Sequence, residues 1–257
     1  MRLLTLARDL KRRKAREREG VFVVEGIRAV EELLRSPLSI NGILAAPKLI
    51  DSPRGVSLLE SARAHGIEVA EVDEKEFRSA AETESPQGII AIAKTPAHSL
   101  ESLGELKQAR ILLLDAVQDP GNVGTMLRTT IALGGGGVIA LKGTAELTNP
   151  KVVRGSMGAL FRIPAFSASE AELRRWVTEN SVELWLAAAD APPIPELPGR
   201  HVRPPICLVV GNEGAGVSSS IESRAVRRVG VPLEAGAESL NVAVAAGILL
   251  YELTRAP

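Results

Sequence analysis

The sequence has little cysteine and no long apolar run. Its single cysteine, Cys207, lies within the apolar run ICLVVG. One cysteine excludes a disulfide framework and a cysteine-based zinc site, and it favours a reducing compartment. Apolar runs such as residues 111–114 are too short to cross a bilayer, and no apolar signal core follows the basic N-terminus. We therefore expect a soluble cytoplasmic protein with no metal site and no membrane partner.

Aromatic side chains are also scarce, at 3% of the chain, whereas hydrophobic residues make up 45%. The core must therefore consist of Leu, Val, Ile and Ala, which suits α/β layers with buried aliphatic strands. The chain has 257 residues, a length that fits one large domain or two smaller ones.

Net charge is zero over the whole chain, but residues 1–19 carry eight Lys or Arg against three Asp or Glu. A local basic segment can bind phosphates even in a neutral chain. It can equally be a solvated amphipathic helix, so the composition leaves both interpretations open. The candidate phosphate-binding residues of this segment are Arg8, Lys11, Arg12, Arg13, Lys14 and Arg16.

The first hundred residues alternate between helical and strand patterns, which predicts a small α/β sandwich. We expect this first domain to cover residues 1–95. Residues 96–108 contain Pro96, Gly104 and mixed charges without a period, and they are interpreted as a linker. Strands are predicted over residues 21–25, 40–46, 67–72 and 88–93, and helices over 3–18, 27–34 and 56–64.

A second α/β series occupies residues 109–257. Residues 111–117 are apolar on both faces, as a central parallel strand should be. Ser167 and Glu170 have the spacing of a capping box, so a helix is expected to start there. Further strands are predicted over residues 138–141, 183–189, 206–211 and 229–233, and helices over 123–133 and 240–253.

Glycine-punctuated segments follow the strands of this second series, where ligands bind in parallel α/β sheets. In LDAVQDPGNVGTMLRT, Asn122 lies near a helix start, where its side chain can cap the helix, and Arg128 follows within the helix. An ordinary strand–turn–helix with a surface arginine remains an open alternative. In VRGSMGALFRIP, small residues lie between Arg154 and Arg162, and a packing role is favoured for them.

The third segment, from Val210 to Leu253, has the most specific pattern. VGNEGAG leaves a strand, and Ser239 and Asn241 precede an apolar helix that they can also simply cap. The glycines do not form a Walker motif, because no GK[ST] follows. They also lack the G-x-G-x-x-G spacing of dinucleotide-binding proteins.

Together, DPGNVGTMLRT, GSMGALFRIP and LVVGNEGAGVS…VGVPLEAGAESLNVAVAAGILLYE resemble the SpoU/TrmH family of RNA ribose 2′-O-methyltransferases, within the SPOUT superfamily. The resemblance covers residues 109–257. LARDLKRRKAREREGVFVVEGIRAVEELL looks like the substrate-binding domain that precedes the catalytic domain in many members, which is similar to a small RNA-binding ribosomal protein.

The resemblance implies a parallel-sheet domain with a trefoil knot, a homodimer and S-adenosyl-L-methionine as cofactor. Arg128 is expected to bind a substrate phosphate and polarise the 2′-hydroxyl, because guanidinium stays protonated. Glu213 is expected to act either as a base or as an anchor for Arg128. The implied catalytic residues are Asn122, Arg128, Glu213, Ser239 and Asn241, and the implied cofactor contacts are Gly211, Asn212, Val231, Pro232 and Leu240.

The expected partner is RNA, with ribosomal RNA favoured over transfer RNA, and with Arg154 as a further contact. DNA is not expected, since the 2′-hydroxyl distinguishes the two nucleic acids. Two other classes remain as alternatives. One is a non-catalytic RNA-binding or ribosome-assembly protein of the same fold, against which the intact set of site residues argues. The other is a different nucleotide-binding enzyme, such as a dehydrogenase, against which the missing dinucleotide fingerprint argues.

Overall fold

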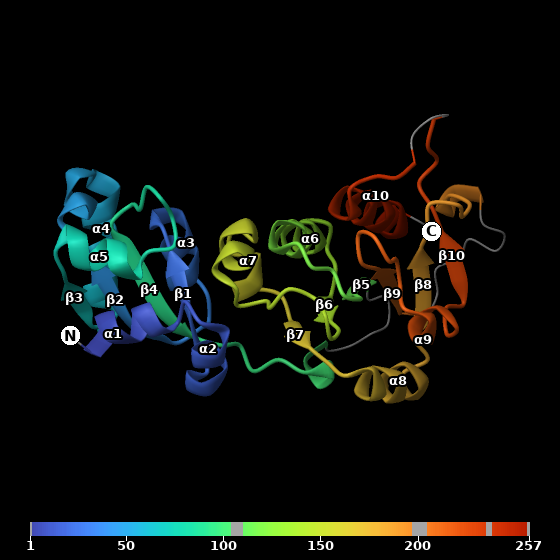
Figure 1. The fold of residues 1–257 in the computed structure, drawn as a ribbon, viewed down its shortest axis with the longest axis horizontal. Helices are drawn as coiled ribbons and strands as arrows, with labels where there is room; N and C mark the ends of the chain where they lie inside the picture. Colours follow the sequence, from blue (N-terminus) through green and yellow to red (C-terminus); the bar gives the residue numbers. More distant parts are fainter. Residues whose placement is uncertain (1, 104–109, 197–204, 235–237, 256–257) are drawn as a thin grey trace. The chain divides into compact units, whose positions relative to one another are not determined.

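The computed structural model describes residues 2–103, 110–196, 205–234 and 238–255. The chain forms two compact units (Figure 1). The first unit comprises Met1–Pro96 together with Thr148–Arg162, and the second comprises Ala97–Leu147 and Ile163–Pro257. Both units combine helices with a β-sheet, which confirms the predicted α/β class.

The first unit contains a four-stranded sheet in the order β1-β4-β2-β3. The three strands β1, β4 and β2 pair antiparallel, and β3 pairs parallel to β2. The four strands, at the predicted places, are β1 (Val21–Glu25), β2 (Ile40–Ala45), β3 (Val69–Glu71) and β4 (Ile89–Lys94). The helices from the first part of the chain are α1 (Arg2–Asp9), α2 (Arg13–Glu19), α3 (Ile27–Leu34), α4 (Pro53–Ala64) and α5 (Glu74–Ala80).

The basic helix predicted over residues 3–18 is in fact two helices, α1 and α2. Leu10 is fully buried between them, and Arg12 adopts an extended backbone at the start of α2. Arg16 donates hydrogen bonds from its guanidinium to the carbonyl oxygens of Leu10 and Lys11, at 2.7 and 2.9 Å. Periodicity alone did not reveal this break, because the basic residues continue across it.

Most of the glycine-containing segment GSMGALFRIP, residues 155–162, packs within the first unit together with α7 (Pro150–Gly155), as the packing interpretation anticipated. The rings of Phe161 and Phe22 lie 6.2 Å apart, and Arg162 forms an ion pair with Glu32. Gly158 has a φ of 88°, and a Cβ there would lie 2.8 Å from the Cβ of Glu32. The positive φ and the close approach to Glu32 therefore both disfavour any residue other than glycine at this position.

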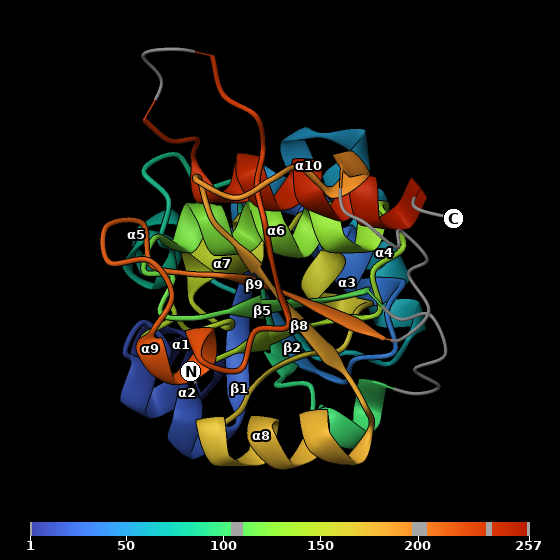
Figure 2. The same cartoon turned by 90° about the vertical axis from the view of Figure 1, so that its right-hand side faces the viewer.

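The second unit is built on a six-stranded, all-parallel sheet in the order β10-β8-β9-β5-β6-β7. Helices α6 (Pro120–Ala132) and α10 (Val242–Arg255) lie side by side on one face of the sheet, and α8 (Glu170–Glu179) covers the other (Figures 1 and 2). The strands are β5 (Arg110–Leu114), β6 (Gly137–Ala140), β7 (Ala165–Ser167), β8 (Glu183–Ala187), β9 (Ile206–Val210) and β10 (Arg227–Val229), and the short helix α9 (Ser219–Glu222) follows β9.

The core of the second unit is aliphatic, as the composition predicts. The inner strands β5 and β9 are buried along their whole length, and Leu173 and Trp176 of α8 pack onto them. Cys207 is fully buried in β9, and this burial raises the pKa of its thiol far above the ordinary value. The thiol is therefore a packing group rather than a nucleophile.

Two local predictions in the second half need correction, and one strand was missed. Helix α8 begins at Glu170 behind a capping box formed by Ser169 and Glu172, not by Ser167 and Glu170. The edge strand β10 precedes the predicted residues 229–233, overlapping them only at Val229. The short strand β7 was not predicted at all. Among the described residues, no helix has the length and apolarity needed to cross a bilayer.

Candidate functional site

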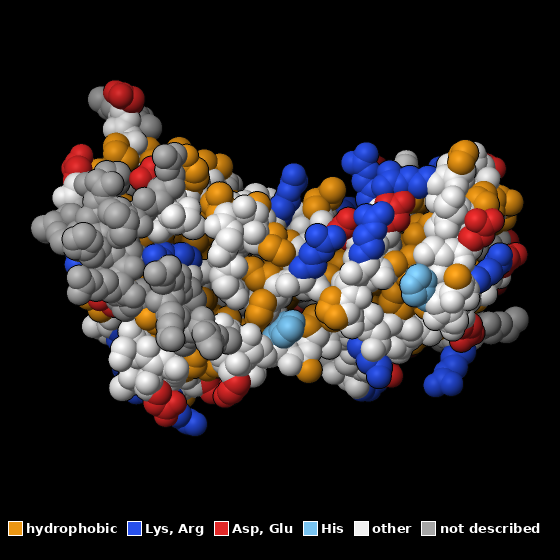
Figure 3. Space-filling view, turned by 180° about the vertical axis from the view of Figure 1, so that it is seen from behind, with side chains coloured by type: hydrophobic (Ala, Val, Ile, Leu, Met, Phe, Trp, Pro, Cys, Tyr) orange, Lys and Arg blue, Asp and Glu red, His pale blue; other side chains and the backbone are white. Residues whose placement is uncertain are grey.

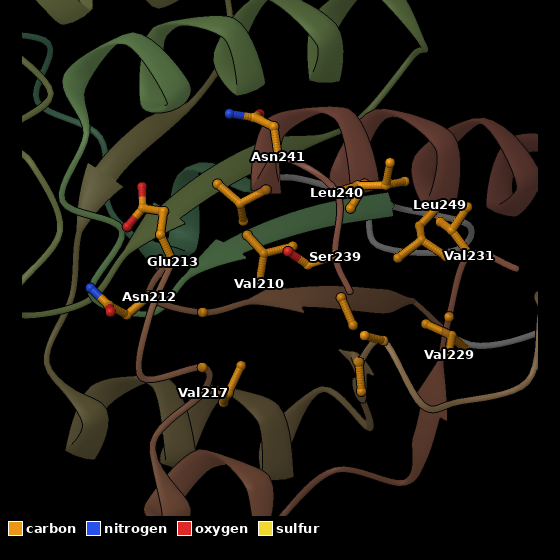
Figure 4. Close-up of a pocket in the computed structure, with 18 of the residues that line it drawn as sticks. Val210, Asn212, Glu213, Val217, Val229, Val231, Ser239, Leu240, Asn241 and Leu249 are labelled. Carbon is orange, nitrogen blue, oxygen red and sulfur yellow. The ribbon is translucent and has the colours of Figure 1, made fainter. Parts of the chain in front are cut away.

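A cavity of about 410 Å³ opens at the carboxyl ends of β8, β9 and β10 in the second unit (Figure 4). Its walls come from the loops that follow these three strands, from the segment preceding α10, and from α10 itself. This volume falls within the ~300–1,000 Å³ range of small-molecule sites. Of the predicted cofactor contacts, Gly211, Asn212, Val231 and Leu240 line the cavity, whereas Pro232 is not among the lining residues.

Gly211 is closely packed against backbone in the cavity wall. A Cβ on this residue would lie 2.3 Å from the backbone carbon of Gly216 and 2.4 Å from the nitrogen of Val217. The turn between them is closed by two backbone hydrogen bonds joining Asn212 and Gly216, at 2.9 and 3.0 Å. Only glycine fits at position 211, so the wall there is backbone.

Two further wall residues offer backbone donors. The N–H groups of Val231 and Leu240 form no hydrogen bond with another described residue. Val231 is half-buried and Leu240 is exposed at the cavity. Both N–H groups are therefore available to donate hydrogen bonds to acceptor atoms of a ligand.

The loop after β9 is fastened to the loop after β5 through Asn212. The Asn212 amide nitrogen donates to the carbonyl oxygen of Ala116 at 3.0 Å. Its amide oxygen accepts from the backbone of Gly214 and Ala215, at 3.0 and 2.9 Å. The side chain of Asn212 thus shapes the loop, and both backbone groups of Asn212 are bonded to Gly216.

Glu213 holds the same two loops together on the other side of the turn. Its carboxylate accepts hydrogen bonds from the backbone N–H groups of Gln118 and Asp119 and, at 3.0 Å, from the amide of Asn122. Partial burial raises the pKa of Glu213, but these hydrogen bonds more than offset it and hold the pKa below its ordinary value. A carboxylate held ionised in this way is a poor proton acceptor. Of the two predicted roles, the anchoring role fits, but the anchored residue is Asn122 rather than Arg128.

Asn122 also links the loop after β5 to the start of α10. Its amide oxygen accepts a hydrogen bond from the amide of Asn241 at 2.9 Å. The amide oxygen of Asn241 in turn accepts from the backbone N–H groups of Ala243 and Val244, so Asn241 caps α10. The cap of α6, however, is Asp119 rather than Asn122, because Asp119 accepts from the N–H of Asn122 at 2.7 Å. Glu213, Asn122 and Asn241 therefore form one continuous hydrogen-bonded chain.

Arg128 and Ser239 are less constrained than the other candidate catalytic residues. Arg128 is exposed on α6 and forms no hydrogen bond or ion pair with another described residue. It does not line the cavity, whereas Ser239 does, and the Ser239 hydroxyl also lacks a partner among the described residues. Asn241, not Ser239, provides the helix cap. Both side chains are therefore free to contact a substrate.

Sequence reasoning missed Asp115, which follows β5 directly. Its buried carboxylate accepts hydrogen bonds from both the backbone N–H and the hydroxyl of Ser218, each at 2.7 Å. Because Ser218 ends the glycine loop after β9, this contact fixes the far end of that loop. The only available signal was a carboxylate at the end of an apolar strand, which needs a partner when buried.

The basic N-terminal segment divides into residues that are available for phosphates and residues that are not. Lys11 and Lys14 are exposed and form no ion pair with another described residue, whereas Arg12 pairs with Asp9 and Arg13 with Glu17. Arg16 is only 4% exposed and bonds to backbone carbonyls, so it holds the α1–α2 turn instead of facing solvent. Arg8 donates to Ser79, and Arg154 is exposed on α7. Figure 3 shows basic side chains mixed with acidic ones on one face of the first unit.

Comparison with known proteins identifies the family to which the chain belongs. Residues 109–251 match the model of the SpoU rRNA Methylase family, and residues 5–91 match the MRM3-like substrate binding domain. This protein belongs to the SpoU rRNA methylase family. The SpoU match begins just before β5 and ends within α10, so it includes every strand of the parallel sheet and the whole cavity.

Relatives match over nearly the whole chain. The 23S rRNA (guanosine(2553)-2′-O)-methyltransferase RlmP of Bacillus subtilis (strain 168) is 37% identical over 247 residues, which is 96% of this chain and 93% of that protein. A 23S rRNA (uridine(2479)-2′-O)-methyltransferase of Streptomyces viridochromogenes is 29% identical over 95% of this chain and 85% of that protein.

Solved structures confirm the fold. The SpoU methyltransferase AviRb of Streptomyces viridochromogenes, in complex with the cofactor AdoMet, superposes with a TM-score of 0.89 at 27% identity, covering 98% of this chain and 97% of that chain. An AdoMet-bound rRNA methyltransferase of Sinorhizobium meliloti gives a TM-score of 0.85 at 27% identity, covering 98% and 94%. The expected trefoil knot is consistent with these SPOUT-type neighbours.

Proposed function

We propose that this protein is an S-adenosylmethionine-dependent methyltransferase that methylates a ribose 2′-hydroxyl of ribosomal RNA in the cytoplasm. One observation carries the proposal: a cavity walled by glycine backbone borders the hydrogen-bonded chain of Glu213, Asn122 and Asn241. Membership of the SpoU rRNA methylase family supports it, as do the two relatives, both named as 23S rRNA 2′-O-methyltransferases. These names favour ribosomal RNA over transfer RNA.

The cavity suits S-adenosylmethionine by its chemistry. The N–H groups of Val231 and Leu240 are available for the edge of an adenine ring, and the bare backbone at Gly211 allows close approach. Aliphatic side chains such as Val210 and Leu249 complete the walls. When bound, the cofactor supplies a methyl group that the positive charge of its sulfonium already activates. No charged side chain is needed to activate it.

The protein's own task is to align and polarise the ribose. Alignment of reacting groups alone lowers such a barrier by ~7 kcal/mol or more. Arg128 is exposed on α6 and unpaired among the described residues, so its guanidinium can bind a substrate phosphate and polarise the 2′-hydroxyl. It stays protonated throughout and does not act as a base. Ser239 lies in the cavity wall with a free hydroxyl, from which it contacts ribose or cofactor.

Glu213 and the two asparagines act as positioning residues in this scheme. The three hydrogen bonds that lower the pKa of Glu213 also fix the start of α6 against the cofactor loop. The bond between Asn122 and Asn241 fixes the same point against α10. Because Arg128 lies on α6, less than two turns beyond Asn122, its placement depends on this network.

RNA binding is assigned to the first part of the chain. We propose residues 1–95 as the RNA-substrate-binding domain, 96–108 as the linker and 109–257 as the methyltransferase domain; part of that linker lies outside the described residues. Lys11 and Lys14 supply phosphate contacts directly; the exposed Arg8, Arg12 and Arg13 supply them by exchanging their present partners for phosphates, and Arg154 adds another. DNA is excluded as a substrate because it lacks the 2′-hydroxyl.

Replacing Lys11, Arg12, Arg13 and Lys14 together by alanine should weaken RNA binding and flatten its salt dependence. Each lost phosphate contact lowers the slope of log affinity against log salt by about 0.7–0.9. Fluorescence anisotropy of a ribosomal RNA fragment over a salt series measures both quantities. Arg78→Ala, on the exposed side of α5, is the matched control. Unchanged affinity and slope in the quadruple variant would make the segment a solvated surface only.

A homodimer is proposed through the outer face of α10. Val244, Ile248 and Tyr251 are large apolar residues of α10 that remain exposed, and their spacing places them along one stripe of the helix. Ile248→Glu should shift the protein from dimer to monomer in sedimentation velocity, because a buried unpaired carboxylate is costly. Thr178→Glu on α8 adds the same charge elsewhere and should leave the dimer intact. A monomeric wild-type protein would contradict this assignment.

The activity itself is tested by incubating the protein with methyl-labelled S-adenosylmethionine and, separately, unmodified ribosomal RNA, transfer RNA and DNA. Label should enter the ribosomal RNA only. Label in transfer RNA alone would correct the substrate class, and label in DNA would exclude a 2′-hydroxyl acceptor. Absence of label in all three pools, despite cofactor binding, would favour a non-catalytic RNA-binding role.

A further inference from the structure

A second cavity, of about 260 Å³, lies in the first unit where β1 ends and α3 begins. It shares no residue with the cavity at the parallel sheet. Its volume is below the ~300–1,000 Å³ of ordinary small-molecule sites, so it suits a single planar base better than a whole nucleotide. Its walls include Glu25, Arg28, Gln87, Arg154 and Met157.

The floor of this cavity is fixed before any ligand arrives. The two carboxylate oxygens of Glu25 accept hydrogen bonds from the backbone N–H of Glu82 and from the hydroxyl of Thr83. The side-chain oxygen of Gln87 accepts the first N–H of α3, from Ile27, at 2.9 Å. Gly26, with a φ of 102°, makes the close turn beneath them. A preformed floor reduces the ordering cost of binding.

Glu25 lines the cavity and still has acceptor capacity. A carboxylate offers about four lone-pair sites, and each of its two oxygens uses one of them in the floor. One site therefore remains on each oxygen. Guanine presents two adjacent donors, N1–H and N2–H, on its Watson–Crick edge. Adenine and cytosine place a ring-nitrogen acceptor beside their amine, and uracil flanks its single N–H with two carbonyls.

Two arginines complement the remaining edge of guanine. Arg28 and Arg154 are exposed at the cavity, and arginine pairs well with the O6 and N7 acceptors of guanine or with a flanking phosphate. Arg154 forms no hydrogen bond or ion pair with another described residue. The one other carboxylate in the wall, Glu32, is compensated by ion pairs with Arg162 and Arg35. Met157 is 47% exposed at the wall and offers its thioether to an aromatic face.

We propose that this cavity binds one unpaired guanine of the RNA, at a nucleotide other than the one whose ribose is methylated. The inference rests on the proposed function in that the ligand is RNA. Single-stranded RNA exposes the Watson–Crick edges that such a site needs. The first unit would then read one base in addition to binding phosphates.

The test uses the 257-residue chain and four fluorescently labelled pentaribonucleotides that differ only at the central base: UUGUU, UUIUU, UUAUU and UUUUU. Inosine keeps the N1–H of guanine but lacks its amine. In anisotropy titrations UUGUU should bind about tenfold more tightly than UUUUU, since a good bidentate base contact discriminates about 5- to 150-fold. UUIUU should fall between the two. Equal affinity for all four would overturn the proposal.

Substitutions in the cavity wall test whether the preference for guanine arises in this cavity. Glu25→Gln should remove most of the preference for guanine over uracil, because the amide offers one acceptor in place of two. Arg154→Ala, a change at an exposed side chain, should weaken UUGUU binding about fivefold. Arg78→Ala removes an exposed arginine outside the cavity and should preserve the preference. A guanine preference that survives both Glu25→Gln and Arg154→Ala would place the site elsewhere and overturn the proposal.

Failure of this proposal can be separated from failure of the proposed activity. Methyl transfer to ribosomal RNA is measured on the same wild-type preparation. Transfer without any guanine preference would refute the guanine site alone. Guanine preference without transfer would support the site and count against the activity alone.

Discussion

Replacing Arg128 by alanine should abolish methyl transfer while leaving S-adenosylmethionine binding nearly unchanged. Arg128 is exposed on α6, does not line the cofactor cavity and is unpaired among the described residues. Its removal therefore costs the folded protein little. Loss of one preorganised donor near a reacting oxygen lowers turnover by about 10²- to 10³-fold, and loss of the phosphate contact lowers it further.

The measurement is kcat with ribosomal RNA, together with the Kd for S-adenosylmethionine by calorimetry. Arg175→Ala, an exposed arginine on α8, is the matched control and should leave both values unchanged. Arg128→Lys keeps the charge but loses the forked geometry, so it should recover only part of the activity. An Arg128→Ala variant that fails to bind cofactor would contradict the assigned role. Full activity would contradict it equally.

Gly211→Ala should abolish cofactor binding, because the added methyl group has no space. Its Cβ would lie 2.3–2.4 Å from three backbone atoms of Gly216 and Val217. Backbone atoms cannot move aside as a flexible side chain can, so the loop between Asn212 and Gly216 has to open. That loop carries Glu213, whose hydrogen bonds hold the start of α6. Both the cavity wall and the placement of Arg128 should be lost together.

Gly214→Ala is the matched control for this prediction, since it lies in the same loop. The nearest atom to a Cβ at position 214 is the side-chain oxygen of Asn212, at 3.7 Å, which is ordinary contact. Calorimetry should therefore detect cofactor binding in Gly214→Ala and none in Gly211→Ala. Thermal unfolding shows whether the second unit still folds in each variant. Normal cofactor affinity in Gly211→Ala would contradict the assignment of the cavity.

The fold class and most elements could be predicted because the relevant signals are local. Short apolar segments placed β1 and β2, and the fully apolar run at residues 111–114 indicated a central parallel strand. The break between α1 and α2 could not be predicted in this way. It depends on the burial of Leu10 and on the backbone contacts of Arg16, which only the folded unit defines.

The loops of the candidate site could be located from sequence motifs, but the hydrogen bonds that join these loops to one another could not. The contacts of Glu213 with Asn122 and of Asn241 with Asn122 join residues about a hundred positions apart. Spacing along the chain carries no information about such pairs, so Glu213 was assigned to anchor Arg128 rather than Asn122. Asp115 was missed for the same reason, because its partner Ser218 lies on a different loop.

The central claim is the position of the transferred methyl group. Ribosomal RNA methylated by this protein with labelled S-adenosylmethionine is digested to nucleosides and analysed by mass spectrometry. All label should lie in a single 2′-O-methylated nucleoside. The neighbouring phosphodiester should resist alkali, because its 2′-oxygen is blocked. Label on a base, or alkali-sensitive labelled RNA, would contradict it.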